Sequence, residues 1–430
     1  MDEEVRICVH GLRPRQPVIL RAATEDDDGR CWSSHGHFLA DESGSVDVVT
    51  QESRGGTYRG ASPMGLLWSM RLDDPRANGH STFAKNGVSP NRVSLEVEQD
   101  GRVIASAELE RTFVAPGTQV RDLNIGDNLT GNSRSHEAGR VGRLFIPPGR
   151  GPHPVVIVLS GSGGGFDLDK AAALSRHGFA TLALAYFGIP PLPAWLHRIP
   201  LDYFDTALAW LASHPELDTE RIGALGVSRG AELALLLGTK FPQIRAFVAY
   251  APSSLVWAAG GRDKATGEII PSWTWRGEPV PFAPLPLRGF MLRSALPVAV
   301  ARRPVMFRNL FRAGLRNRDG VARAAIPVEQ IRGPILLISG GDDHVWPAAE
   351  MCETMLARLT DHRFPHSVEY RNYPRAGHML RYPYLPTTAR QSRNRHLRNV
   401  RFSFGGSAPT DAEANADSWR RAIAFLRAHL

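Results

Sequence analysis

Residues 222–238 read IGALGVSRGAELALLLG, an apolar strand, a tight turn and a helical segment in direct succession. Ser228 lies at the turn between Gly226 and Gly230, in the pattern Gly-x-Ser-x-Gly. Glycines at these places let the chain turn sharply, so the serine hydroxyl is expected to project over the N-terminus of the next helix. The helix dipole favours developing negative charge there. The pattern by itself is equally compatible with a turn of small residues that performs no chemistry.

Similar apolar runs occur throughout the second half of the chain and alternate with segments of helical periodicity. Buried strands separated by helices predict a mostly parallel sheet with helices on both faces. A Pro- and Arg-rich stretch over about 254–330 breaks the alternation, and we expect it to form a cap over the strand ends. The expected strands are 155–161, 181–187, 222–228, 247–253, 335–341 and 368–374.

The first part of the chain has a different pattern, with short strands, frequent turn signals and no helical stretch between them. Asp100 and Gly101 join two of these strands in the arrangement typical of a hairpin. The pattern predicts an all-β, immunoglobulin-like sandwich. We therefore expect two domains, the sandwich with its linker over 1–134 and an α/β catalytic domain over 135–430, connected within the polar stretch 119–140.

The composition indicates a soluble globular protein, because 43% of the 430 residues are hydrophobic and 22% are charged. The net charge of +8 comes from basic residues that are scattered over most of the chain, which argues against nucleic-acid binding. Three dispersed cysteines predict neither a disulfide framework nor a zinc site, and we expect no metal. No secretory signal and no long apolar stretch is seen, so we expect a cytoplasmic protein without a membrane span.

Two polar loops follow later strands and supply partners for a serine nucleophile. Such a serine needs a base and an orienting acid, and in the α/β-hydrolase fold these follow it in the order Asp or Glu, then His. Asp342 and Asp343 come after the strand 335–341, and His378 comes after the strand 368–374. Asp343 is preferred over Asp342 because two residues then separate the acid from Gly340. We predict a triad of Ser228, Asp343 and His378.

A serine-dependent acyl transfer also needs donors for the oxyanion. The backbone N–H of Arg229, directly after the serine, is one expected donor. The glycine-rich run LSGSGGGFD (159–167) follows an earlier strand and offers Ser162, or next Gly163, as the second. This run lacks the lysine of a phosphate-binding P-loop and the acidic residue of a dinucleotide site.

The chain resembles the family of acyl-CoA thioesterases and bile acid-CoA:amino acid N-acyltransferases over nearly its whole length. The resemblance rests on VHGLRPRQPVILRA and SPMGLLWSM in the first half, and on GPHPVVIVLSGSGGGFD, RIGALGVSRGAELALLL, GGDDHVW and YPRAGHMLRYPYLP in the second. It implies an α/β hydrolase behind an immunoglobulin-like sandwich, with the triad on Ser228, Asp343 and His378. The implied substrate is an acyl-CoA or acyl-carrier thioester, with coenzyme A as part of the substrate and no separate cofactor.

The identity of the nucleophile favours hydrolysis over transfer. An oxygen ester on Ser228 reacts poorly with amines, whereas the amino-acid-conjugating members of the family carry cysteine in the turn. The alternatives are an acyltransferase, an esterase of secondary metabolism, an enzyme whose sandwich docks a carrier protein, and a catalytically silent scaffold. The sequence does not specify the acyl group, the thiol carrier or the oligomeric state.

A role in substrate binding for arginines of the expected cap is a further hypothesis. Their planar guanidinium groups suit the phosphates of coenzyme A, and an arginine cluster above Ser228 could attract them. A solvated helix face is the alternative for each of them. The candidate substrate-binding residues are Arg302, Arg303 and Arg308.

Overall fold

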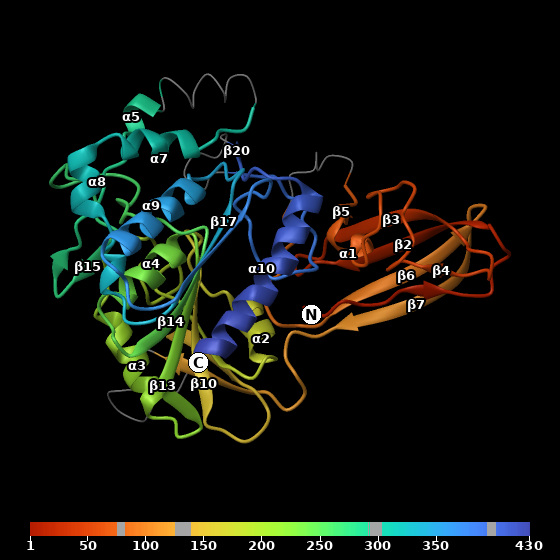
Figure 1. Cartoon of the computed structure of the whole chain (residues 1–430), viewed down its shortest axis with the longest axis horizontal. Helices are drawn as coiled ribbons and strands as arrows, with labels where there is room; N and C mark the ends of the chain where they lie inside the picture. The colour runs from red at the N-terminus through yellow and green to blue at the C-terminus, as the bar shows by residue number, and fades with distance from the viewer. Residues whose placement is uncertain (75–81, 125–138, 291, 293–302, 394–400) are drawn as a thin grey trace.

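The computed structural model describes residues 1–74, 82–124, 139–290, 292, 303–393 and 401–430. An eight-stranded sheet dominates the second part of the chain, and a smaller β-rich part lies to one side of it (Figure 1). The fold predicted from the sequence, an α/β hydrolase behind an all-β part, is confirmed at this level.

The large sheet has the strand order β18-β17-β14-β13-β10-β11-β9-β8. Its central strands pair in parallel, while β9 is antiparallel to both β8 and β11. Each predicted strand is present, shifted by at most a few residues. The strands are β8 (Gln119–Asn124), β9 (Arg140–Ile146), β10 (His153–Leu159), β11 (Ala180–Leu184), β13 (Leu217–Val227), β14 (Ile244–Tyr250), β17 (Ile335–Gly340) and β18 (Val368–Tyr373).

Helices cover both faces of this sheet, as the sequence predicts. Successive residues of β10 point alternately into two hydrophobic cores, which explains why its run of valine, isoleucine and leucine is uninterrupted. One face is covered by α2 (Leu168–Ser175) and α10 (Ala408–His429), and the other by α3 (Tyr203–Ala212), α4 (Arg229–Gly238) and α9 (Ala348–Asp361).

The cap that the sequence predicts is the insertion between β14 and β17. This insertion contains β15 (Trp273–Trp275), β16 (Glu278–Pro279), α5 (Leu287–Phe290), α7 (Arg308–Leu315), α8 (Arg318–Ala324) and the 3-10 turn η2 (Val328–Gln330). The short strand β12 (Ile199–Pro200) joins β15 from outside the insertion. A second pair of short strands, β19 (Gln391–Arg393) and β20 (Arg401–Ser403), lies before α10.

The first part of the chain is built from two antiparallel sheets. Five strands are ordered β5-β3-β2-β6-β7, and β1 pairs with β4. Alternate residues of β2 are buried, and their core also contains Val46 of β4. The elements are β1 (Cys8–Val9), β2 (Pro17–Glu25), β3 (Cys31–Leu39), β4 (Val46–Asp47), α1 (Gly65–Trp68), β5 (Arg71–Leu72), β6 (Asn91–Gln99) and β7 (Arg102–Arg111).

The predicted hairpin is confirmed, because β6 and β7 are joined through Asp100 and Gly101. Their φ angles of 49° and 77° are those that a tight hairpin turn requires and that Asp-Gly supplies. The expectation for 119–140 is only partly met. Residues 119–124 form β8, the edge strand of the large sheet, rather than a connection, and residues 125–138 lie outside the described part.

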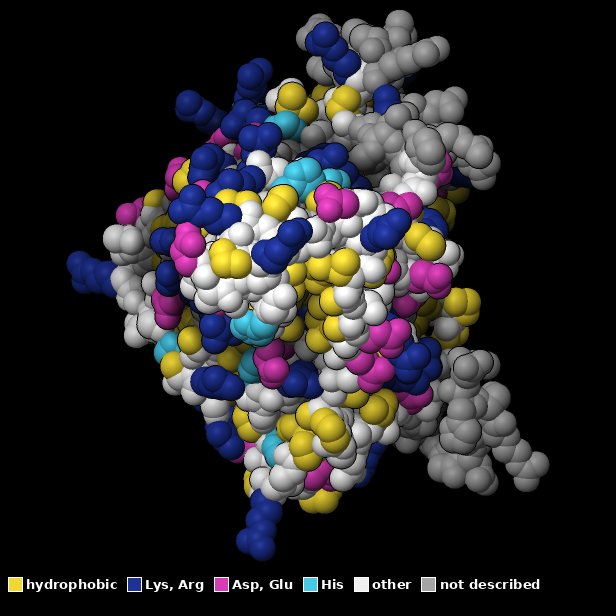
Figure 2. Space-filling model, turned by 90° about the vertical axis from the view of Figure 1, so that its right-hand side faces the viewer, with side chains coloured by type: hydrophobic (Ala, Val, Ile, Leu, Met, Phe, Trp, Pro, Cys, Tyr) yellow, Lys and Arg dark blue, Asp and Glu magenta, His cyan; other side chains and the backbone are white. Residues whose placement is uncertain are grey.

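The two parts of the chain share one continuous hydrophobic core and a polar contact surface. The Phe113 ring meets the Tyr382 ring edge-on with centroids 5.9 Å apart. Arg111 Nη1 donates to the carbonyl of Tyr384 at 2.9 Å. On the face that includes the β-rich part, Lys and Arg side chains are spread among Asp and Glu (Figure 2).

Candidate active site

Ser228 occupies the sharp turn between β13 and α4. Its φ of 57° and ψ of −119° form a strained backbone conformation for a residue with a side chain. A Cβ on Gly226 would lie 2.1 Å from the carbonyl oxygen of Gly230, and a Cβ on Gly230 would lie 2.3 Å from that of Ser160. Both glycines are therefore required for the helix to pass this close to the strands.

Asp343 and His378 meet beside this turn. His378 Nδ1 and Asp343 Oδ2 are 2.7 Å apart, and both side chains are almost fully buried. The other carboxylate oxygen, Oδ1, accepts backbone N–H bonds from Val345 at 2.7 Å and Trp346 at 3.1 Å. The carboxylate is thus held from both sides, with one oxygen directed at the imidazole.

The Asp342 carboxylate contacts other groups than His378. Its Oδ2 accepts the backbone N–H of Gly406 at 2.9 Å, and its Oδ1 lies 3.0 Å from His344 Nε2. The structure therefore brings Asp343, and not Asp342, to His378. Asp342 instead connects the acid loop to the segment before α10.

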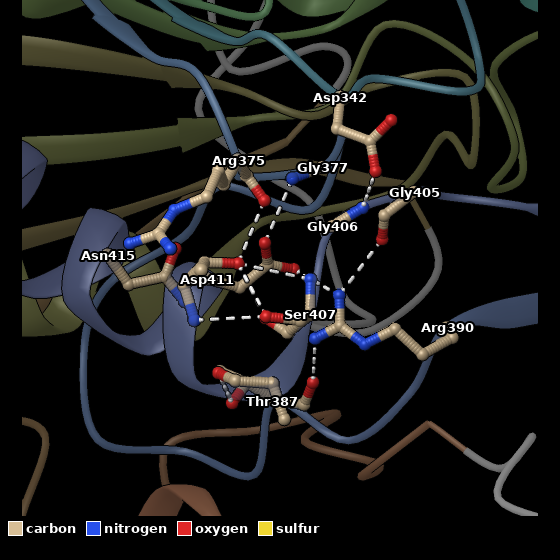
Figure 3. A network of polar contacts seen from close by, with 12 residues as sticks. Asp342, Arg375, Gly377, Thr387, Arg390, Gly405, Gly406, Ser407, Asp411 and Asn415 are labelled. Carbon is tan, nitrogen blue, oxygen red and sulfur yellow. Dashed lines mark hydrogen bonds and ion pairs between the residues drawn. The ribbon is translucent and has the colours of Figure 1, made fainter.

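A polar network holds the loop of His378 (Figure 3). Asp411, on the first turn of α10, accepts the backbone N–H of Gly377 on Oδ1 at 2.9 Å, and Arg390 Nη1 donates to its Oδ2 at 2.6 Å. Burial raises the pKa of Asp411, while Arg390 acts in the opposite direction. The backbone N–H of His378 donates to the carbonyl of Phe404 at 2.8 Å.

Sequence reasoning missed this network, although a signal for it exists. A Cβ on Gly405 would collide with the carbonyl of Asp342, and a Cβ on Gly406 would lie 2.4 Å from the backbone nitrogen of Gly377. This glycine pair directly precedes Ser407, the N-cap of α10. Two adjacent glycines directly before a helix start indicate a close approach of other backbone segments.

The expected oxyanion donors lie next to the serine. Ser162 and Gly163 line the same cavity as Ser228 and His378, and the backbone N–H of Arg229 opens α4. A Cβ on Gly161 would lie 3.5 Å from Ser228 Cβ, so this glycine-rich backbone passes directly beside the serine. The glycine-rich backbone and the start of α4 thus both lie beside Ser228.

The side chain of Arg229 makes hydrogen bonds to residues of the cap. Its Nη1 donates to Glu232 Oε2 at 2.7 Å, and its Nη2 donates to the Trp257 carbonyl at 3.1 Å and to the Ser272 hydroxyl. Glu232 also accepts the indole N–H of Trp273 at 2.8 Å. Burial raises the pKa of Glu232 to about 7, although Arg229 lowers it.

The cavity at Ser228 has a volume of about 590 Å³ and lies between the two parts of the chain. Its walls include Arg30 and residues 82–86 from the β-rich part, together with His378 and Phe404 from the α/β part. Four basic side chains and two acidic ones line it, namely Arg30, Lys85, Lys170 and Arg381 with Asp28 and Asp167. No sequence motif predicts that the β-rich part contributes to this cavity.

Of the three candidate cap arginines, Arg303 and Arg308 belong to the described residues, and neither lines this cavity. Arg303 is exposed and precedes Val305, which pairs with Phe402, a residue of the cavity wall. The backbone N–H of Arg308 donates to the carbonyl of His344 at 3.0 Å. Arg302 lies outside the described residues.

The described residues contain neither a cluster of metal-binding side chains nor a membrane-spanning helix. No group of three or more His, Cys, Asp or Glu side chains is arranged to hold a metal ion there. In the same part of the chain, no helix is both long and apolar enough to cross a bilayer.

Comparison with known proteins gives matches over the whole chain. The family described as "Acyl-CoA thioester hydrolase/BAAT N-terminal region" matches residues 2–125, and "BAAT / Acyl-CoA thioester hydrolase C terminal" matches residues 199–430. The peroxisomal succinyl-coenzyme A thioesterase of Mus musculus is 32% identical, with 100% of this chain and 94% of that protein covered.

Two further matches are a human protein and a solved structure. Acyl-coenzyme A thioesterase 1 of Homo sapiens is 31% identical, again over 100% of this chain and 94% of that protein. A solved esterase of Pyrobaculum calidifontis is a remote likeness, with 15% identity, a TM-score of 0.41, and coverage of 72% of this chain and 85% of the esterase.

Proposed function

The chain belongs to the acyl-CoA thioester hydrolase/BAAT family, and from this membership we propose that it hydrolyses acyl-CoA thioesters through an acyl-enzyme on Ser228. The observation that carries the mechanism is the 2.7 Å contact between His378 Nδ1 and Asp343 Oδ2 in the cavity that Ser228 also lines. Relatives named as coenzyme A thioesterases support coenzyme A as the thiol.

The first half of the reaction transfers the acyl group to the serine. Asp343 accepts a hydrogen bond from the Nδ1–H of His378, which leaves the unprotonated Nε2 as the base for the Ser228 hydroxyl. The serine oxygen attacks the thioester carbonyl carbon, and the backbone N–H groups of Arg229 and Ser162 or Gly163 stabilise the oxyanion. The C–S bond then breaks, and His378 gives its proton to the departing thiolate.

The second half consumes one water. His378 Nε2 removes a proton from the water, whose oxygen attacks the ester carbon on Ser228. The tetrahedral intermediate collapses, the serine oxygen takes back the proton from His378, and a carboxylic acid leaves. Hydrolysis is favoured over amide formation because an oxygen ester on Ser228 is less reactive toward amines than a thioester on cysteine would be.

The test is turnover of acyl-CoA by the purified protein, measured as released thiol and free acid. We expect Ser228→Ala to fold normally and to lower kcat by about 10³-fold or more. A serine-reactive phosphonate should label the wild type and not the variant. Retention of more than about a tenth of kcat by Ser228→Ala would show that the turn is only structural. Amide formation with added glycine or taurine would instead favour the transferase.

The compartment remains a prediction. The sequence favours the cytoplasm, whereas the names of the relatives include peroxisomal and mitochondrial enzymes.

A further inference from the structure

A second, smaller cavity adjoins the one at Ser228. Its volume is about 200 Å³, and Ser162 lines both cavities. Apart from Ser162 and Arg229 its walls near the serine are mainly apolar and aromatic, with Phe187, Trp257 and Phe311 among them. The buried Nε of Arg229 has no hydrogen-bond partner.

The positions of the catalytic groups distinguish the two cavities. His378 must protonate the departing thiolate, so the leaving group has to lie on the side of Ser228 where His378 is found. His378 lines the larger cavity, where basic side chains outnumber acidic ones. The smaller cavity opens past Ser162 and Arg229, whose backbone N–H groups are the expected contacts of the thioester carbonyl oxygen.

We propose that the acyl chain of the substrate lies in the smaller cavity and continues into the cap, while coenzyme A occupies the larger cavity. This inference rests on the proposed function. An apolar wall suits an alkyl chain, because burying each methylene group contributes about 0.8 kcal/mol. A cavity of about 150 Å³ holds one benzene molecule, so the smaller cavity takes roughly six to eight carbon atoms.

A third cavity provides space for the distal part of longer acyl chains. It has a volume of about 470 Å³ and shares Ala258, Ala259 and Leu285 with the smaller cavity. Ile269 and Leu287 also line it. The two alanines are 6% and 5% exposed, and their small side chains form part of the wall that the two cavities share. The smaller and the third cavity together can therefore hold an acyl chain longer than about eight carbon atoms.

The experiment measures kcat/KM for straight-chain acyl-CoA substrates from acetyl to palmitoyl, in the wild type and in Ala259→Phe. We expect Ala259→Phe to lower kcat/KM for dodecanoyl and longer substrates at least about tenfold more than for hexanoyl and shorter ones, because one lost methylene contact alone costs several-fold. Melting temperatures check that the variant is folded. Ala259→Leu provides a smaller obstruction at the same place if the phenylalanine is not tolerated.

Ala84→Phe is the matched control, since Ala84 lines the larger cavity with His378. It adds the same volume there and should lower kcat/KM by a similar factor at every chain length. The assignment would be overturned if Ala84→Phe changed the dependence of kcat/KM on acyl chain length and Ala259→Phe did not. It would also be overturned if neither variant changed that dependence. A wild type that turns over only short chains would contradict the continuation into the cap. A wild type without any acyl-CoA hydrolysis would instead refute the proposed function.

Discussion

Asp411 Oδ1 accepts the backbone N–H of Gly377, the residue before His378, at 2.9 Å. The carboxylate thus fixes the loop that carries His378, the proposed catalytic base, without touching the imidazole. We expect Asp411→Ala to lower kcat by roughly 10- to 100-fold with little change in KM, because small misplacements of a catalytic group have effects of this size. Steady-state kinetics across the acyl-CoA panel measures both constants.

The controls separate positioning from general stability. Asp417, on the same helix, accepts hydrogen bonds from the Tyr373 hydroxyl and Arg421 rather than from Gly377, so Asp417→Ala should keep the wild-type kcat. Asp411→Asn retains an acceptor for Gly377 and should recover most of the activity. Equal losses of kcat in the alanine variants of Asp411 and Asp417 would mean that α10 merely stabilises the fold.

The two adjacent aspartates of the acid loop should differ in their effect on catalysis. Asp343→Asn presents an amide to His378 and favours the wrong tautomer, a change that lowers kcat by about 10⁴ in a serine protease. Asp342→Asn still offers an oxygen to Gly406 and should lose less than about tenfold, since loops of this kind tolerate one weakened neutral hydrogen bond. The comparison uses kcat under saturating substrate. The opposite ranking would assign the orienting role to Asp342.

Glu232 should give the protein a measurable pH dependence of stability. Its pKa is raised to about 7 by burial, so between about pH 4.5 and 7 the folded state holds a proton that the unfolded state has lost. Stability therefore falls with rising pH in this window and levels off above it. Relative to Glu232→Gln, we expect the wild type to lose up to about 3 kcal/mol across the window.

Urea unfolding at intervals from pH 4.5 to 8, followed by tryptophan fluorescence, measures this difference. The variant serves as the reference for all other titrating groups, because they are common to both proteins. If the difference in unfolding free energy between wild type and variant stays constant across this pH range, Arg229 offsets the effect of burial on the pKa of Glu232.

The cap arginines predict a dependence on salt. Raising the salt to 1 M shortens the Debye length to about 3 Å and should weaken kcat/KM for a CoA thioester but not for an uncharged short thioester. Arg303→Gln combined with Arg308→Gln should reduce this dependence, whereas Arg15→Gln, an exposed arginine of the β-rich part, should not. An unreduced dependence in the double variant would move the phosphate contacts to the basic residues that line the cavity.

The sequence predicts the features that depend on local pattern. Periodicity located the central strands, and loops at strand ends identified Ser228, Asp343 and His378 as candidates that the structure brings to one region. The choice between Asp342 and Asp343 followed from a turn of fixed length. These signals persist in the sequence because each is confined to one strand and its following loop.

Contacts between distant segments could not be predicted in this way. Arg30 and His378 line one cavity, and Asp411 holds Gly377, yet no spacing rule relates either pair. The same holds for β8, whose exposed, mixed residues pair with β9 because of the sheet edge that β9 provides. A cavity between two parts of a chain becomes visible only when their packing is known.

The place of Asp411 on the last helix has a consequence for synthesis on the ribosome. A nascent chain that has reached residue 400 already contains the serine, the acid and the histidine, but not the carboxylate that holds the histidine loop. Domains generally fold in the order in which they are translated, so the nucleophile turn can form long before its base is held in place. Competence for the proposed thioester cleavage therefore requires Asp411, and chains released before residue 411 should remain without activity.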